Sequence, residues 1–376
     1  MSSGMIEKDS FSHTFSYSQI GTFKICPQQY KIIYIDGVRK EKESIEINFS
    51  EEIETESSLL KKEAVFWVRD MINTPPLDKT PEFFIEKIKN LNNKVDITIY
   101  DEKWLEDNNF GAVLGVAKGS ERKPYFLVGE YNKKAETQIA LIGKGVMFDS
   151  GGLSLKSPSG METMKTDMAG AATAWGVMSL ISKHQIDVGL TVLTPIVENM
   201  PSGSAIRPGD VLTARNGKTI EVLNTDAEGR LIMADALAFA SEKKPDLICD
   251  VATLTGASYV ALGVEIGAIF SNNKEIENKF MKSTETSGED FYPLPLHSEY
   301  KKLIDSDIAD MKNTGGRFGG AITAALLLEN FVDNINWVHL DIAGPARSSN
   351  RKGATGFSVL TLFEFFTNFA KNHSEN

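Results

Sequence analysis

Four carboxylates that could hold metal ions fall in three short segments of the sequence. The segments are GKGVMFDSGG (residues 143–152) with Asp149, MKTDMAGAA (residues 164–172) with Asp167, and NTDAEGRL (residues 224–231) with Asp226 and Glu228. Carboxylate oxygens suit hard divalent cations, and a cage of several can hold two ions. All five histidines lie outside these segments, so such a site would be rich in oxygen.

Each segment also has a purely structural interpretation. The glycines of the first segment are equally consistent with a flexible loop, and the segment is no P-loop because Ser or Thr does not follow Gly-Lys. Asp167 is expected on the apolar stripe of a helix that contains Met164 and Trp175, where a salt bridge would satisfy it as well as a metal. Thr225 and Glu228 match a helix capping box, although this leaves Asp226 and Arg230 without a role.

The elements that must position these segments alternate along the chain. The expected helices span residues 59–72, 81–91, 162–182, 228–242, 273–286, 321–332 and 359–369, and the expected strands span residues 138–142, 188–196, 247–252, 266–271 and 337–342. Asn216-Gly217 predicts a hairpin turn. His339, within the last strand, is expected to be a packed core residue. This alternation predicts an α/β fold with a mixed, mainly parallel sheet flanked by helices, and with its site at the carboxyl ends of strands.

Composition narrows the class of partner. The 376 residues carry a formal net charge of −11, which argues against nucleic acid as the main partner, because phosphate binding favours a basic surface. The two cysteines indicate no disulfide framework and favour a reducing compartment. No signal peptide or membrane-spanning run is present in the sequence, so a cytoplasmic location and no membrane partner are expected.

The motifs closely resemble those of the leucyl aminopeptidase family, the cytosolic two-metal aminopeptidases. Residues 224–231 reproduce the family's eight-residue signature, and residues 143–152 and 167–172 match two further family runs. Residues 253–257, 313–316 and 341–344 are also similar to family segments. The resemblance extends from about residue 59 to residue 369 with order and spacing kept.

The resemblance implies roles for individual residues of this chain. The metal ligands would be Lys144, Asp149, Asp167, Asp226 and Glu228. Asp149 and Glu228 would bridge two divalent ions, Mn²⁺ or Zn²⁺. Lys156 and Arg230 fall on the family's catalytic positions, with bicarbonate held by Arg230 as general base. The pocket for the first side chain would be lined by Met164, Thr253, Gly256, Ala343 and Ala346.

The implied activity is removal of single N-terminal residues from peptides, with Leu or another apolar residue preferred. Lys144 can bind a metal only as a neutral amine, which nearby cations favour. Lys156 is expected to stay charged and to stabilise an oxyanion. The family forms hexamers of two stacked trimers, so a homo-oligomer is expected. The alternatives are a non-enzymatic regulator or DNA-binding scaffold on the same fold, and a hydrolase of another amide.

The N-terminal part departs from the family. Residues 1–56 stand where family members carry a larger domain, which places the hexamer in question, and residues 57–376 form the expected catalytic domain. Residues 15–30 resemble the opening of a RecB-type nuclease module. The later acidic and Glu-x-Lys positions of such a nuclease have no room here, and Cys26 alone cannot hold an iron–sulfur cluster. An added docking segment or a fusion remnant without nuclease activity is therefore expected.

Overall fold

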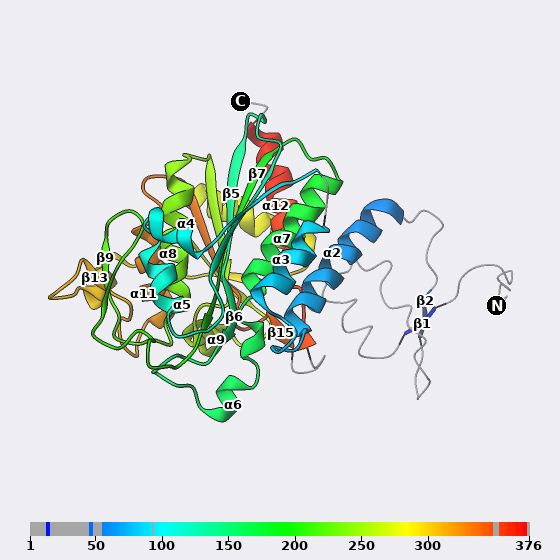
Figure 1. The fold of residues 1–376 in the computed structure, drawn as a ribbon. Coiled ribbons are helices and arrows are strands. Elements are labelled where there is room, and N and C mark those ends of the chain that lie inside the picture. The colour runs from blue at the N-terminus through cyan, green and yellow to red at the C-terminus, as the bar shows by residue number, and fades with distance from the viewer. Residues whose placement is uncertain (1–12, 16–44, 48–54, 92–93, 349–352, 374–376) are drawn as a thin grey trace, which may run out of the picture.

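A computed structural model of the chain describes residues 13–15, 45–47, 55–91, 94–348 and 353–373. Within these residues, nine strands form one mixed sheet, in the order β12-β11-β14-β10-β5-β7-β4-β3, with β6 paired to β7 (Figure 1). The strands are β3 (Asp96–Tyr100), β4 (Tyr125–Tyr131), β5 (Gln138–Gly143), β6 (Gly145–Asp149), β7 (Gly189–Asn199), β10 (Leu247–Ala252), β11 (Gly267–Ser271), β12 (Phe291–Pro293) and β14 (Trp337–Asp341).

The centre of the sheet is parallel. Strands β14, β10, β5 and β7 run parallel to one another, and β6 pairs in parallel with the far end of β7. Antiparallel pairs appear toward the edges, between β11 and β14, β4 and β7, and β3 and β4. The predicted mixed, mainly parallel sheet is therefore confirmed. Each predicted strand is present, whereas β3, β4, β6 and β12 were not predicted.

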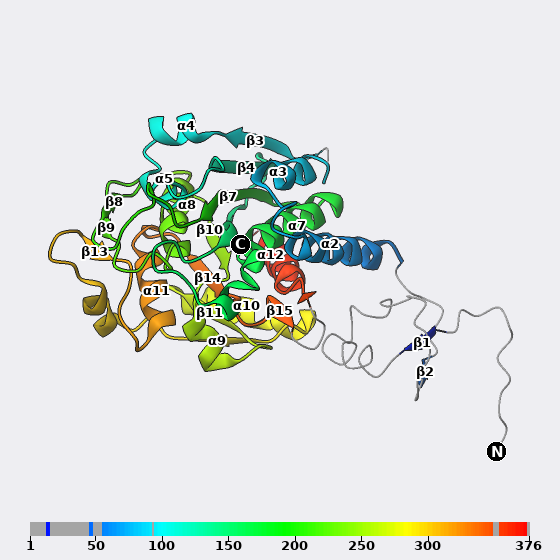
Figure 2. The same cartoon turned by 60° about the horizontal axis from the view of Figure 1, so that its bottom comes forward.

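Helices cover both faces of the sheet (Figures 1 and 2). One face packs on α2 (Thr55–Asn73), α3 (Pro81–Lys89), α7 (Ala169–Lys183), α10 (Lys274–Ser287) and α12 (Val359–His373). The other packs on α4 (Glu102–Asp107), α5 (Gly111–Ala117), α8 (Gly229–Glu242) and α11 (Gly320–Glu329). Among the described residues, none of the helices combines the length and apolar character that a membrane span requires.

Shorter elements complete the described part. They are α6 (Pro158–Met161), η1 (Met164–Thr166), α9 (Gly256–Leu262), η2 (Ser298–Ile304), β8 (Val211–Thr213), β9 (Thr219–Glu221), β13 (Met311–Lys312), β15 (Arg347–Ser348) and β16 (Gly353–Ala354). The antiparallel pairing of β8 with β9 confirms the hairpin predicted at Asn216-Gly217. A separate antiparallel pair, β1 (His13–Phe15) with β2 (Ile45–Ile47), is described from the N-terminal part. The rest of residues 1–54, including nearly all of the nuclease-like stretch, lies outside the described residues.

The predicted helix over residues 162–182 is wrong at its start. The structure divides it into η1 and α7, and Asp167 lies between them with φ −73° and ψ 2°, outside α-helical geometry. The amide of Ala171, in the first turn of α7, donates to the carbonyl of Lys144 on the neighbouring loop, at 2.8 Å. Asp167 is therefore not on the apolar stripe of a helix, and its carboxylate is free to turn toward other groups.

The structure also decides the predicted roles of Thr225 and His339. Thr225 does not cap α8, because its hydroxyl donates to the carbonyl of Gly151 at 2.6 Å and accepts from the amide of Ser154. The capping-box interpretation is therefore wrong. His339 is fully buried and its Nδ1 lies 2.5 Å from Oδ1 of Asp250, which confirms that it is a core residue.

Candidate metal centre and active site

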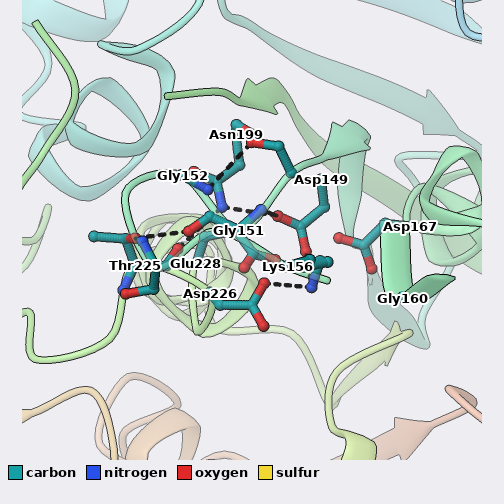
Figure 3. Close-up of polar contacts among 12 residues, drawn as sticks. Asp149, Gly151, Gly152, Lys156, Gly160, Asp167, Asn199, Thr225, Asp226 and Glu228 are labelled. Atoms are coloured by element: carbon teal, nitrogen blue, oxygen red, sulfur yellow. Dashed lines mark hydrogen bonds and ion pairs between the residues drawn. The ribbon is translucent and has the colours of Figure 1, made fainter. Parts of the chain in front are cut away.

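The three acidic segments meet at one end of the sheet. Asp149 is the last residue of β6, Asp167 follows η1, and Glu228 immediately precedes α8. Oxygen atoms of Asp149, Asp226 and Glu228 lie within 4.8 Å of one another, a spacing that one or two cations could share. Figure 3 shows these carboxylates and that of Asp167 directed toward one region, with Lys156 beside them.

The loop after β6 is built around the Asp149 carboxylate. The amide of Gly151 donates to Asp149 Oδ1 at 2.9 Å, and the Asn199 amide group donates to the same oxygen at 2.8 Å (Figure 3). Gly151 has a φ of 86°, which a side chain would strain, and its Cβ would come within 2.9 Å of Asp226 Oδ1. Glycine here therefore both permits the turn and leaves room for the neighbouring carboxylate.

Lys144 lies inside the cluster and is almost fully buried. Its Nζ donates to Asp167 Oδ1 at 2.7 Å and to the carbonyl of Thr253 at 2.9 Å, and lies 2.9 Å from Glu228 Oε1. Burial alone would lower the pKa of this amine, but the carboxylates of Asp167 and Glu228 outweigh it and raise the pKa above its ordinary value. The amine is therefore in contact with two of the predicted ligands.

Lys156 occupies the other side of the cluster. Its Nζ lies 2.7 Å from Asp149 Oδ2 and also forms an ion pair with Asp226. Burial alone would lower the pKa of Lys156, but the carboxylates of Asp149 and Asp226 have the larger, opposite effect. The pKa of Lys156 is therefore above its ordinary value. The side chain therefore carries a positive charge at neutral pH.

The carboxylates have divergent pKa values. Burial raises the pKa of Asp149 to about 6, with a further contribution from the charge of Glu228, against the opposing effect of the two lysines. Burial also raises the pKa of Asp167 well above its usual value. It raises the pKa of Asp226 as well. For Glu228, burial raises the pKa, but Lys144 and Lys156 lower it below the usual value on balance. Several carboxylates with little exposure to solvent lie close together here, and bound cations would stabilise their charged forms.

Among the described residues, two carboxylate oxygens of the cluster are buried with neither a hydrogen-bond donor nor an ion pair. They are Asp167 Oδ2 and Glu228 Oε2. A buried carboxylate oxygen left without a partner is costly, and a divalent cation satisfies it directly. Together with the mutual proximity of Asp149, Asp226 and Glu228, these oxygens fit the two divalent ions that the sequence predicts.

The cluster forms the floor of a cavity of about 930 Å³. The metal-ligand candidates, Lys156 and four of the predicted pocket residues, Met164, Thr253, Gly256 and Ala343, line this cavity. Ala346 is buried and is not among the lining residues. The next residue, Arg347, lines the cavity in its place, and so do Tyr259 of α9 and Val264.

Arg230, predicted to be catalytic, is not among the residues that line the cavity. It is buried, its Nη1 donates to the carbonyl of Asn313 at 2.9 Å, and its Nε has no hydrogen-bond partner among the described residues. Burial lowers the pKa of Arg230 to about 10, although Glu228 and Asp341 raise it. The guanidinium therefore remains positively charged at neutral pH, with one donor still to be satisfied.

Two residues that sequence reasoning did not select as site residues support the site. Asn199, at the end of β7, joins Asp149 to the carbonyl of Thr225 through its amide group. Asn313 accepts from the amides of Leu223 and Asn224 and so fixes the start of the third segment. Asn313 belongs to a family-like segment and Asn199 ends a predicted strand, but neither position carries a charge that would have drawn attention to it.

The sequence is similar to a known family of enzymes over most of its length. Residues 66–363 match the catalytic domain of the cytosol aminopeptidase family. The chain is 48% identical over 305 residues to a probable cytosol aminopeptidase of Syntrophotalea carbinolica, covering 79% of this chain but only 61% of that relative. A probable cytosol aminopeptidase of Rickettsia felis is 45% identical, with 87% of this chain and 69% of the relative covered.

A solved structure is also similar. The bottromycin maturation enzyme BotP in complex with Mn superposes with a TM-score of 0.81 at 36% identity, covering 84% of this chain and 72% of BotP. The chain spans less than two thirds of the length of the S. carbinolica relative. The family model that it matches is that of the catalytic domain. The extent of the match, across most of the chain, shows that this protein belongs to the cytosol aminopeptidase family.

Proposed function

We propose that this protein is a metal-dependent aminopeptidase that releases N-terminal residues from peptides, with Leu or another apolar residue preferred. The observation that carries the proposal is the cluster of the buried Asp149 and Glu228 with the partly buried Asp226, which lines a cavity of about 930 Å³. Membership of the cytosol aminopeptidase family supports the reaction class, and the Mn complex of the similar BotP structure supports a divalent metal.

Two divalent ions, Mn²⁺ or Zn²⁺, would be held by Asp149, Asp167, Asp226, Glu228 and Lys144. The amine of Lys144, whose pKa is raised in the metal-free chain, would have to lose its proton when the ions bind, because their positive charge favours the neutral amine. When bound, such ions polarise a carbonyl group and make a water nucleophilic near neutral pH. The chain supplies acceptors for them in the buried oxygens of Asp167 and Glu228 that lack donors. The hydrogen bonds from Gly151 and Asn199 orient the Asp149 carboxylate.

Lys156 is proposed to stabilise the oxyanion that forms when the peptide carbonyl is attacked. Its raised pKa keeps it protonated, and it lines the cavity within reach of the carboxylates. Arg230 is proposed to hold a bicarbonate that acts as general base. The Nε of Arg230 has no hydrogen-bond partner within the described part of the chain, and this donor and the positive charge suit a planar anion, which a guanidinium can bind through two parallel hydrogen bonds.

The first side chain of the substrate is proposed to lie among Met164, Thr253, Gly256 and Ala343, which line the cavity. Ala346 would support this wall from behind. A cytoplasmic location and a homo-oligomeric assembly are proposed from the resemblance to cytosolic family members. Peptides are the proposed substrates.

The test is hydrolysis of leucine p-nitroanilide by protein loaded with Mn²⁺, Zn²⁺ or Co²⁺. We expect metal-dependent release of p-nitroaniline, lowered about a hundredfold or more in Asp226→Ala and Lys156→Ala. The matched controls are Asp307→Ala and Lys282→Ala, which change exposed residues outside the cavity and should leave the rate unchanged. Absence of activity with every metal, or activity kept in both site variants, would refute the proposal.

A further inference from the structure

The wall of the cavity contains a cation that is independent of the metal cluster. Arg347, the first residue of β15, lines the cavity and is half-buried. Lys144 and Lys156 are each paired with two carboxylates. The guanidinium of Arg347, in contrast, forms no ion pair with any described carboxylate. Among the described residues that line the cavity, Arg347 is therefore the one lysine or arginine whose charge is not balanced by a carboxylate.

The backbone that carries Arg347 is held in place on both sides. Arg347 pairs with Ala354 in the β15–β16 hairpin, and the amide of Ala354 donates to Asn73 Oδ1 at the end of α2, at 3.0 Å. The preceding residue is fixed too, because the amide of Ala346 donates to the carbonyl of Ile342 and its own carbonyl accepts from Thr355. Arg347 therefore lines the cavity from a backbone that is held in place, which lowers the entropic cost of binding a partner there.

The chemistry of this group selects its partner. A guanidinium stays protonated at physiological pH and presents parallel N–H donors that match the two oxygens of a carboxylate. The cavity's own carboxylates already contact lysines and face the metal centre. A carboxylate brought in by the substrate would find Arg347 as its free counter-charge, near the wall that Tyr259 and Ala343 also line.

We propose that Arg347 binds a carboxylate group of the peptide substrate and so determines specificity. This inference rests on the proposed aminopeptidase function and deepens it. Three parts of a peptide offer the group: an acidic first side chain, an acidic second side chain, and the C-terminal carboxylate of a dipeptide. Arg347 contributes through binding, so its effect falls mainly on KM.

The experiment uses three pairs of substrates that differ in one charge. The pairs are Glu p-nitroanilide with Gln p-nitroanilide, Leu-Glu-amide with Leu-Gln-amide, and Leu-Gly with Leu-Gly-amide. For each pair, the ratio of kcat/KM for the acid to that for the neutral partner is measured in the Mn²⁺-loaded wild type, Arg347→Gln and Arg347→Lys. The control is Arg207→Gln, an exposed arginine that does not line the cavity.

We expect the ratio for at least one pair to fall about tenfold in Arg347→Gln, through KM, and to be partly restored in Arg347→Lys. The pair that responds identifies the source of the carboxylate. Ratios that are unchanged for all three pairs, or equal losses for acid and neutral partners, would overturn the proposal.

Failure of the proposed function would look different. If neither leucine p-nitroanilide nor any of these peptides is cleaved, the aminopeptidase proposal fails, and the peptides are then stable in the presence of the protein. Calorimetric titration of the same pairs still tests Arg347, because a preference for the acid peptide that disappears in Arg347→Gln supports it. Equal affinities of the wild type for both members of every pair would refute it.

Discussion

Gly229 lies directly against the side chain of Lys144: a Cβ atom at Gly229 would be 2.5 Å from Cε of that lysine and 2.7 Å from its Nζ. The first turn of α8 is therefore shaped to leave room for a metal-ligand candidate. The atoms in the way belong to a side chain and not to backbone, so a larger residue at this position would displace the amine and leave the helix intact.

Gly229→Ala is accordingly expected to weaken metal binding without unfolding the protein. Displacement of the Lys144 amine should raise the dissociation constant for Mn²⁺ about tenfold, which corresponds to about 1.4 kcal/mol. Calorimetric titration with Mn²⁺ measures the constant, and circular dichroism checks the fold. Gly203→Ala is the matched control, because a Cβ there meets no atom within 4 Å. An unchanged Mn²⁺ affinity in Gly229→Ala would contradict this account of Lys144.

Metal removal is expected to lower the melting temperature. An ion that binds only the folded chain stabilises it by about 2.7 kcal/mol at a free concentration of 100 times its dissociation constant. The melting temperature should therefore rise with Mn²⁺ and fall with a chelator, as measured by scanning calorimetry. In Asp226→Ala the rise should be much smaller, whereas Asp307→Ala should behave as the wild type. A wild-type melting temperature that is independent of Mn²⁺ would speak against a metal centre.

Asp235 is expected to make stability depend on pH. Its carboxylate is fully buried in α8 and accepts from the amides of Ala112, Val113 and Arg215, and burial raises its pKa to about 7. Because the folded pKa exceeds the unfolded one, the folded state binds more protons, and the stabilisation is lost as pH rises toward and through 7.

Urea unfolding at pH 5 and pH 8 tests this prediction with Asp235→Asn. The free energy of unfolding of the wild type minus that of the variant should be smaller at pH 8 than at pH 5. The variant should be less stable at both pH values, because both oxygens of a carboxyl group can accept a hydrogen bond whereas the amide nitrogen of Asn cannot, so at least one of the three backbone amides loses its partner. A difference that grows with pH would show that the carboxylate is ionised in the folded state.

Lys79 is expected to have the opposite effect on the pH dependence of stability. Its side chain is buried, and its Nζ donates to the carbonyls of Ile72, at 3.1 Å, and Lys165. Burial lowers its pKa to about 7, with a further contribution from the charge of Lys165. Between pH 7 and pH 10 the unfolded chain binds more protons at this residue, so its contribution to stability rises with pH.

Lys79→Met keeps an unbranched side chain of similar length, one atom shorter, and removes the charge. The rise in the free energy of unfolding between pH 7 and pH 9 should be smaller in this variant than in the wild type, as measured by urea unfolding. Lys282→Met, at an exposed position, should keep the wild-type slope. Equal slopes in the wild type and Lys79→Met would show that Lys79 keeps its ordinary pKa when folded.

The central strands could be predicted from sequence because their apolar runs are buried on both faces of the sheet. Strand β10 spans the predicted residues 247–252, and β14 differs from its prediction by one residue. The edge strand β3 has a mixed pattern of exposed and partly buried residues, so it gave no such signal. Strand β6 was hidden by the glycines of its segment, which indicate a loop when taken alone.

At the site, residue types and motifs were enough to bring together the four carboxylates and both lysines, which all line one cavity. The change of direction at Asp167 could not be predicted, because it depends on the hydrogen bond from Ala171 to Lys144, residues that belong to separate segments. The lining role of Arg347 could not be predicted for a similar reason. Which of two adjacent side chains faces the cavity depends on the pairing of β15 with β16.

The placement of Lys144 and Lys156 has a consequence for the order of events in the cell. Their ammonium groups offset part of the repulsion among the carboxylates from within the chain itself. Small zinc domains, in contrast, fold only together with their ion. A newly synthesised copy of this protein is therefore expected to complete its core first and to acquire the proposed ions afterwards. The identity of the bound ion should then depend on the metals available when the ions bind, and a mature molecule is expected to exchange one metal for another.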